Sequence, residues 1–175
     1  LIEDSELART WQVDSITVRK EVNRVAWAKV IILDGDASSG VFTASNDQLF
    51  IPGKKIEIRC GYQNDLITLF KGIIISHSVR VRGQGSGVLV LECRDAAVRM
   101  TVGRKNRYFA RVKDSDAIAR ITGEYSGFTA TAEASTTTHK ELVQANCTDW
   151  DFILTRAEAN GKICLVDDGT FSVMA

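Results

Sequence analysis

Proline is almost missing from this sequence, which contains one in 175 residues. Long apolar runs are missing as well, since stretches such as Val30–Leu33 are far shorter than the roughly 20 residues that span a bilayer. No charge of one sign dominates, because 22 Lys and Arg balance 22 Asp and Glu. The chain as a whole therefore lacks the excess of positive charge by which proteins bind nucleic acids or anionic membranes. Residues 1–10 are acidic and lack an apolar core, so we expect no signal peptide.

The composition that remains is that of a folded globular chain. Hydrophobic residues make up 45% and charged residues 25% of the sequence. These are average values for globular proteins, and they argue against disorder. A chain of this length is enough for one ordinary domain or two small ones, each with a core of its own.

Four cysteines occur, and no two of them form a C-x-x-C pair. Cys60 follows two isoleucines at a spacing of two, and Cys93 follows two leucines in the same way. We therefore expect both to face a core as small apolar residues. The pattern favours reduced, structural cysteines, and a disulfide or a metal site is the alternative. The remaining two are Cys147 and Cys164.

Residues 8–100 have the period-two pattern of β-strands. Val25–Leu33 is apolar on both parities, which is typical of a strand buried on both faces. Pro52-Gly53 predicts a type II turn before the alternating segment Lys55–Tyr62. We expect about six antiparallel strands that close, or nearly close, into a β-barrel domain. In the segment Lys55–Tyr62 the expected core positions are Ile56, Ile58, Cys60 and Tyr62. In the segment Leu66–Arg82 the apolar face consists of Ile73, Ile75, Val79 and Val81. In the segment Val88–Arg94 the expected core positions are Leu89, Leu91 and Cys93.

The pattern changes over residues 101–175, for which we expect a helix-containing α+β segment. Asp114 or Ser115 is expected to cap a short helix that ends at Gly123. Thr148 and Asp151 stand at capping-box spacing before a second helix, which Asn160-Gly161 ends. Asp168-Gly169 predicts a two-residue hairpin turn. We also expect strands at Phe128–Ala134 and at Lys140–Gln144, although the second segment could instead be helical. The second helix is expected to present one apolar stripe, formed by Trp150, Ile153, Leu154 and Ala157.

Several short motifs imitate functional sites, and each has a simpler explanation. Asp34-Gly35-Asp36 starts like a calcium loop, but Ser39 and Ser45 stand where an EF-hand needs Gly and Glu. The glycines of Gly83–Gly87 suit a flexible hairpin better than a phosphate cradle. His77 is expected to be a core or rim histidine. His139-x-Glu141 imitates half of a zinc deaminase signature, but no P-C-x-x-C follows it, so we expect no deaminase chemistry. Asp149-x-Asp151 could bind a metal, but acidic residues at the start of a helix favour its dipole without any ligand.

One basic and aromatic segment, Arg104–Phe109, could contact RNA or phosphate. A solvated connector or a protein contact is the expectation that we favour. The residues alone thus predict no catalytic, cofactor or metal site.

Several blocks together resemble one family. Leu49–Ile58 reads LFIPGKKIEI, and Gly61-Tyr62 and Leu69–Ile74 follow it as GY and LFKGII. This order is similar to the F-x-P-G, I-x-I, G-Y and F-x-G-x-I pattern of Vgr spike proteins, the tip and hub of type VI secretion and related contractile injection systems. Two further blocks resemble the D-W-x-F and R-A-E-x-x-G helix of that family. They are Thr148–Ile153 and Arg156–Gly161.

Val18–Arg24 and Gly103–Phe109 resemble the Bacteroidetes branch, often labelled Rhs-element Vgr protein. The match covers about residues 10–173, and its specificity lies in the order and spacing of the blocks. The resemblance implies a fold like the phage tail hub, in which two related β-barrels per chain form a trimeric ring beneath the inner tube. This chain would supply the first barrel and the start of the next portion, without the OB-like domain and the needle.

The implied partners are the inner tube protein ring, other copies of the spike protein and baseplate components. Nucleic acid and membrane insertion are not expected, and neither is a cofactor or an enzymatic activity, because the hub residues of the family act by packing. Assembly in the cytoplasm followed by delivery with the machine is the expected location. A cell-wall or carbohydrate-binding module, or a peptidoglycan-active domain on a similar barrel, is the alternative.

Overall fold

The computed structural model describes residues 1–35, 40–62, 65–81 and 87–175. The chain folds into two compact units. The first contains residues 1–19 and 26–95, and the second contains residues 20–25 and 96–175. The first unit has one sheet and the second has two, and each unit has its own buried core.

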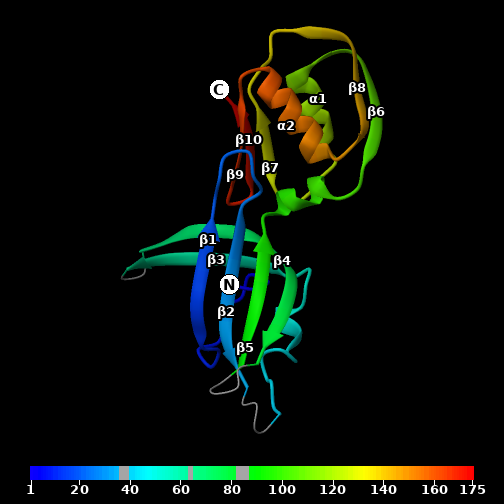
Figure 1. The fold of residues 1–175 in the computed structure, drawn as a ribbon. Coiled ribbons are helices and arrows are strands. Elements are labelled where there is room, and N and C mark those ends of the chain that lie inside the picture. Colours follow the sequence, from blue (N-terminus) through cyan, green and yellow to red (C-terminus); the bar gives the residue numbers. More distant parts are fainter. Residues whose placement is uncertain (36–39, 63–64, 82–86) are drawn as a thin grey trace. The chain divides into compact units, whose positions relative to one another are not determined.

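The first unit is one antiparallel sheet of five strands in the order β1-β2-β5-β4-β3. The sheet curls into a half-barrel, which confirms the predicted mainly β fold of the barrel type (Figure 1). β1 and β3 are its two edges. The strands are β1 (Val13–Arg19), β2 (Trp27–Asp34), β3 (Lys55–Tyr62), β4 (Asp65–Arg80) and β5 (Gly87–Arg94), with a 3-10 turn, η1 (Gln48–Phe50), before β3.

One face of this sheet carries the core. Leu91 of the central strand β5 pairs with Val30 on one side and with His77 on the other, so that these residues share a face. The core prediction for β5 is confirmed, because Leu89, Leu91 and Cys93 are all buried. On β3, Ile56 and Ile58 are buried as predicted. The other buried apolar residues on this face include Ala28, Ile32, Phe70 and Ile74.

The sequence pattern was misleading along β4, where two irregularities interrupt the ladder. Register shifts between Ile58 and Arg59 of β3 and between Ile74 and Ser76 of β4 leave Leu69 and Ile75 as extra residues. Each extra residue moves the core-facing positions to the other parity. The prediction that Ile73 and Ile75 face the core is therefore wrong, and Ile74 is the buried residue.

The far ends of β3 and β4 form a two-stranded arm that projects beyond the other strands (Figure 1). Cys60 and Tyr62 were predicted to face the core, and both are exposed instead. They lie on the core-facing side of β3, but the arm extends past the strands that would cover them. Val81 is also exposed and not a core residue.

Tight turns follow the chemistry of their residues. Gly53 has φ +99°, the left-handed conformation that a type II turn requires after proline. Asp168 and Gly169 both have positive φ, as expected of a type I′ hairpin. Residues 36–39, 63–64 and 82–86 lie outside the described residues, and so does most of the predicted hairpin at Gly83–Gly87.

The second unit places two helices between two small sheets (Figure 1). One sheet has the order β7-β10-β9, and the other pairs β6 with β8. Phe109 of β6 stacks on Phe152 of the second helix, and Trp150 of that helix packs against Phe171 of β10. The elements are η2 (Ala96–Thr101), β6 (Lys105–Lys113), α1 (Asp114–Thr122), β7 (Thr129–Ala132), β8 (Thr138–Cys147), α2 (Asp149–Ala159), β9 (Ile163–Asp167) and β10 (Thr170–Met174).

The start of α2 is as predicted, and the start of α1 is not. The Thr148 hydroxyl accepts a hydrogen bond from the Asp151 amide at 3.1 Å, which caps α2. α1 begins at Asp114, after Lys113, and neither Asp114 nor Ser115 caps it. The Asp114 side chain is instead buried and bonded to other elements. Lys140–Gln144, for which both a strand and a helix were open, belongs to strand β8.

Candidate functional site

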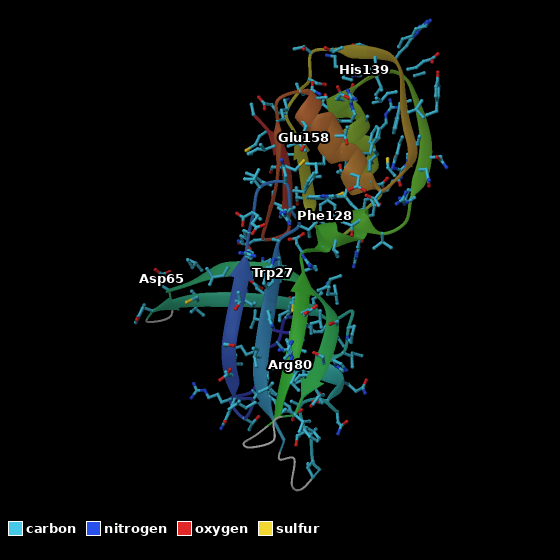
Figure 2. The ribbon with its side chains drawn as sticks, viewed as in Figure 1. Trp27, Asp65, Arg80, Phe128, His139 and Glu158 are labelled. Atoms are coloured by element: carbon cyan, nitrogen blue, oxygen red, sulfur yellow. The ribbon has the colours of Figure 1, made fainter. Side chains whose placement is uncertain are left out.

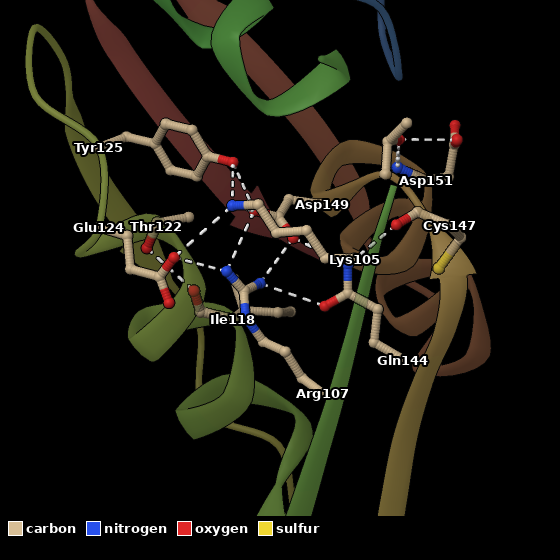
Figure 3. A network of polar contacts seen from close by, with 11 residues as sticks. Lys105, Arg107, Ile118, Thr122, Glu124, Tyr125, Gln144, Cys147, Asp149 and Asp151 are labelled. Carbon is tan, nitrogen blue, oxygen red and sulfur yellow. Dashed lines mark hydrogen bonds and ion pairs between the residues drawn. The ribbon is translucent and has the colours of Figure 1, made fainter. Parts of the chain in front are cut away.

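Two of the three cations in the basic segment 104–109 face a buried carboxylate. Lys105 and Arg107 alternate along β6 and point to the same side, towards Asp149 at the first turn of α2 (Figure 3). Lys105 Nζ lies 2.8 Å from Asp149 Oδ2, and Arg107 Nη1 lies 2.6 Å from Oδ1. Gln144 Nε2 donates to Oδ1 at 2.8 Å, and the Tyr125 hydroxyl donates to Oδ2.

Asp149 stays ionised in this surrounding. Its side chain is fully buried, which by itself disfavours the charge, but the hydrogen bonds from Lys105, Tyr125, Gln144 and Arg107 hold its pKa below the ordinary value. The pKa of Tyr125 is raised by burial and by its bond to Asp149. Glu124 adds a second carboxylate beside Lys105 and Arg107. The positive charges of Lys105 and Arg107 are thus compensated by two carboxylates of the same unit. This arrangement suits a structural cluster better than a site for a nucleic-acid backbone.

A second buried carboxylate, Asp114 of α1, joins its helix to two other elements, α2 and β8. Asp114 accepts hydrogen bonds from Arg156 Nε at 2.5 Å, from Asn160 Nδ2 at 2.9 Å and from His139 Nε2 at 2.8 Å. Burial would raise its pKa, but these donors outweigh burial and lower the pKa to about 2. Asp114 therefore links α1, α2 and β8, and His139 supplies the bond from β8. Glu141 is exposed on β8 and takes no part in this contact.

The remaining sequence motifs have local structural roles. His77 Nδ1 lies 3.2 Å from the Phe50 carbonyl oxygen, as expected of a rim histidine. The Asp34 carboxylate accepts from the amides of Ala44 and Ser45, each at 2.8 Å. Asp36 of the calcium-like motif lies outside the described residues. Among the residues described, no group of three or more His, Cys, Asp or Glu side chains could hold a metal ion.

All four cysteines are free thiols. Burial raises the pKa of Cys93 to about 12 and that of Cys164 to about 11, so both remain protonated and inert at neutral pH. In the part of the chain that the structure covers, no helix is long and apolar enough to cross a membrane.

The first unit carries two features suited to contacts with other molecules. The arm of β3 and β4, whose end is marked by the label of Asp65 in Figure 2, exposes Tyr62 to 88% and Ile67 to 63%. The strand pairing places both on one face with Cys60. A groove of about 130 Å³ lies between the sheet edges, with Val13 and Ile16 of β1 among its lining residues. Sequence reasoning missed both features, because the end of a sheet face cannot be read from alternation.

The fold is that of tail and spike proteins. A tail protein from Neisseria meningitidis superimposes with a TM-score of 0.63 at 16% identity, over 93% of this chain and 45% of its own. A type VI secretion component of E. coli, described as similar to the T4 bacteriophage tail proteins gp27 and gp5, has a TM-score of 0.67 at 11% identity, over 93% and 46%. The 43 kDa tail protein of a Shewanella oneidensis prophage has a TM-score of 0.71 at 8% identity, over 94% and 49%.

The chain belongs to the Alg8 N-terminal domain family, whose model matches residues 1–175. None of the curated proteins matches the sequence. The chain spans about half the length of the solved structures above. The resemblance to Vgr proteins is thus supported at the level of the fold.

Proposed function

We propose that this chain is the N-terminal hub part of the spike of a contractile, phage tail-like injection machine. In this role it caps the inner tube and belongs to the protein that carries the puncturing tip. The observation that supports the proposal most is the extent of the structural likeness, which reaches over 93–94% of the chain in the three tail and spike proteins. A complex described as Francisella PdpA-VgrG contains a further protein of this fold.

The chemistry of the buried carboxylates suits a structural component. Asp149 and Asp114 have all their short contacts with donors of their own unit, and their pKa values are lowered rather than tuned towards neutrality. We therefore propose a non-enzymatic role in which the two units act by packing. The complete protein would be a trimer, with residues 101–175 as the start of the second hub portion.

We further propose that the protein is of the Rhs-element Vgr type found in Bacteroidetes, because the segments Val18–Arg24 and Gly103–Phe109 resemble that branch. The protein would assemble in the cytoplasm and leave the cell with the machine. Its partners would be the inner tube ring, baseplate components and other copies of the spike.

Capture of the tube ring tests this proposal. The chain would be immobilised and exposed to a purified ring-forming tube protein from the same organism, and separately to peptidoglycan sacculi. We expect retention of the ring and no binding or hydrolysis of sacculi. Binding to sacculi without retention of the ring would contradict the hub proposal and favour the cell-wall module. An Asp65→Lys variant, changed at the end of the arm, would show whether the arm takes part.

A further inference from the structure

The ribbon of β6 and β8 covers the two helices of the second unit with one of its faces (Figure 1). Phe109 and Leu142 pair across the ribbon and are both buried on the helix side. The next pair, Tyr108 and Val143, points outwards, because neighbouring side chains of a strand lie on opposite faces. Their exposed fractions are 62% and 57%. An aromatic ring and an aliphatic side chain thus form an apolar pair on the outer face.

Three exposed cations follow further along the same ribbon. Arg111 of β6 and Lys140 of β8 stand opposite each other, since the residues before and after them pair in register. Lys113 ends β6 two residues after Arg111 and is exposed as well. None of the three makes an ion pair or a side-chain hydrogen bond with another residue that the structure describes. The outer face therefore carries three unpaired positive charges beyond the apolar pair.

This arrangement costs stability in three ways. Like charges at opposite positions of a ribbon repel each other. Arg111 has φ +48°, in the left-handed region that suits glycine and strains arginine, and such strain is typical of binding sites. Lys113 is the N-cap residue of α1 without a capping bond from its side chain, and a cation there opposes the helix dipole. The contacts of the described residues do not offset these costs, whereas a negatively charged partner would.

We infer that the outer face of the β6–β8 ribbon binds a protein surface that presents carboxylates beside an apolar side chain. The carboxylates pair with Arg111, Lys113 and Lys140, and the apolar side chain packs on Tyr108 and Val143. Arginine and tyrosine are the residue types that most often dominate the energy of a protein interface. Complementary charge adds orientation and specificity to such a contact. This inference stands on the ribbon and does not depend on the proposed function.

A phosphate backbone fits this face less well than a protein does. Glu141, opposite Ala110, lies between the apolar pair and the cations. Nucleic acid carries a negative charge at every step and would meet this carboxylate, whereas a protein can place a neutral or basic group there. Lys105 and Arg107 are bonded to Asp149 on the inner side, so they add no free cation to the outer face.

Binding to a random copolymer of glutamate and tyrosine tests the inference on the 175-residue chain. The probe carries carboxylates beside aromatic side chains, and the NMR shifts of backbone amides report where it binds. We expect the shifts to concentrate at residues 108–113 and 138–143, and the binding to weaken as salt is added. An oligothymidylate and phosphatidylserine vesicles are the comparison probes. Equally tight binding of either one, shifts elsewhere, or no binding of the copolymer would overturn the inference.

Two substitutions separate a binding role from a structural one. Arg111→Gly removes a charge and relieves the strain of the positive φ, and Lys140→Glu places opposite charges across the ribbon. Each should weaken binding of the copolymer about tenfold and should leave the melting temperature unchanged or raise it. Arg80→Glu is the matched control, because Arg80 is also exposed and makes no ion pair with a described residue. It should bind the copolymer like the parent.

Two results of these variants would contradict the inference, whatever the outcome of the tube-ring experiment. Unchanged binding in both variants, or an equal loss in Arg80→Glu, would show that the copolymer does not recognise this face. A lower melting temperature of either variant would show that its cation stabilises the fold, which removes the reason to assign it to a partner.

Discussion

Two residues of β3, Ile58 and Cys60, separate the core from the arm. Ile58 is buried, and Cys60 lies two residues further on the same side but is exposed. Ile58→Asp should lower the free energy of unfolding by about 3–5 kcal/mol, because it buries an unpaired charge. Cys60→Asp is the matched control and should change stability by less than about 0.5 kcal/mol. Chemical denaturation of both variants measures the difference, and equal losses would place Cys60 in the core after all.

Asp114 makes the stability of the second unit sensitive to acid. Its folded pKa of about 2 is below the ordinary value near 3.9, so its contribution is present above about pH 4 and is lost as the pH falls towards 2. Asp114→Asn should cost about 2 kcal/mol at neutral pH and should flatten the decline of stability between pH 4 and pH 2.

Thermal melts at several pH values check this expectation. Asp116→Asn on the same helix is exposed and serves as the control, which should keep the parental acid profile. If Asp114→Asn loses stability as steeply in acid as the parent, other carboxylates govern acid unfolding.

At the scale of secondary-structure elements, α2 packs against both sheets of the second unit, through Phe152 on β6 and through Trp150 on β10. Trp150 packs against Phe171 with ring centroids 5.9 Å apart, and Ile153 is fully buried. Trp150→Ala should therefore destabilise the protein by about 3–5 kcal/mol. Glu158→Ala, on the exposed side of the same helix, should have little effect. A Trp150→Ala variant that melts like the parent would show that the aromatic contact contributes nothing.

Most of α2 could be predicted because its signals are local. Thr148, the predicted stripe and Gly161 with φ +66° all act within a few residues of one another. Of the stripe, Trp150, Ile153 and Ala157 are buried as predicted, and Leu154 is half-buried. Phe152 was missed, since it faces β6 and not the predicted stripe. The bonds from Lys105 and Arg107 to Asp149 could not be predicted, because they join residues 44 and 42 positions apart. Sequence spacing carries no information on such pairs.

At the scale of the whole molecule, the open question is how copies associate. The isolated chain should be monomeric or weakly associating at micromolar concentration, since a stable interface buries roughly 1,200 Å² or more and outward positions such as Arg59 and Arg80 are charged and exposed. The complete protein should be a trimer if the hub proposal holds. Size exclusion with light scattering on both lengths measures this. A stable trimer of the 175-residue chain would mean that these residues carry the oligomer contacts by themselves.

The two extra residues of β4 also affect how relatives of this chain should be aligned. Core-facing positions along β4 are odd near Ile67, even near Phe70 and Ile74, and odd again near His77. A relative that keeps both bulges aligns through the strand without interruption. One that lacks a bulge needs a single-residue gap at Leu69 or Ile75, inside a strand, where gaps are usually penalised.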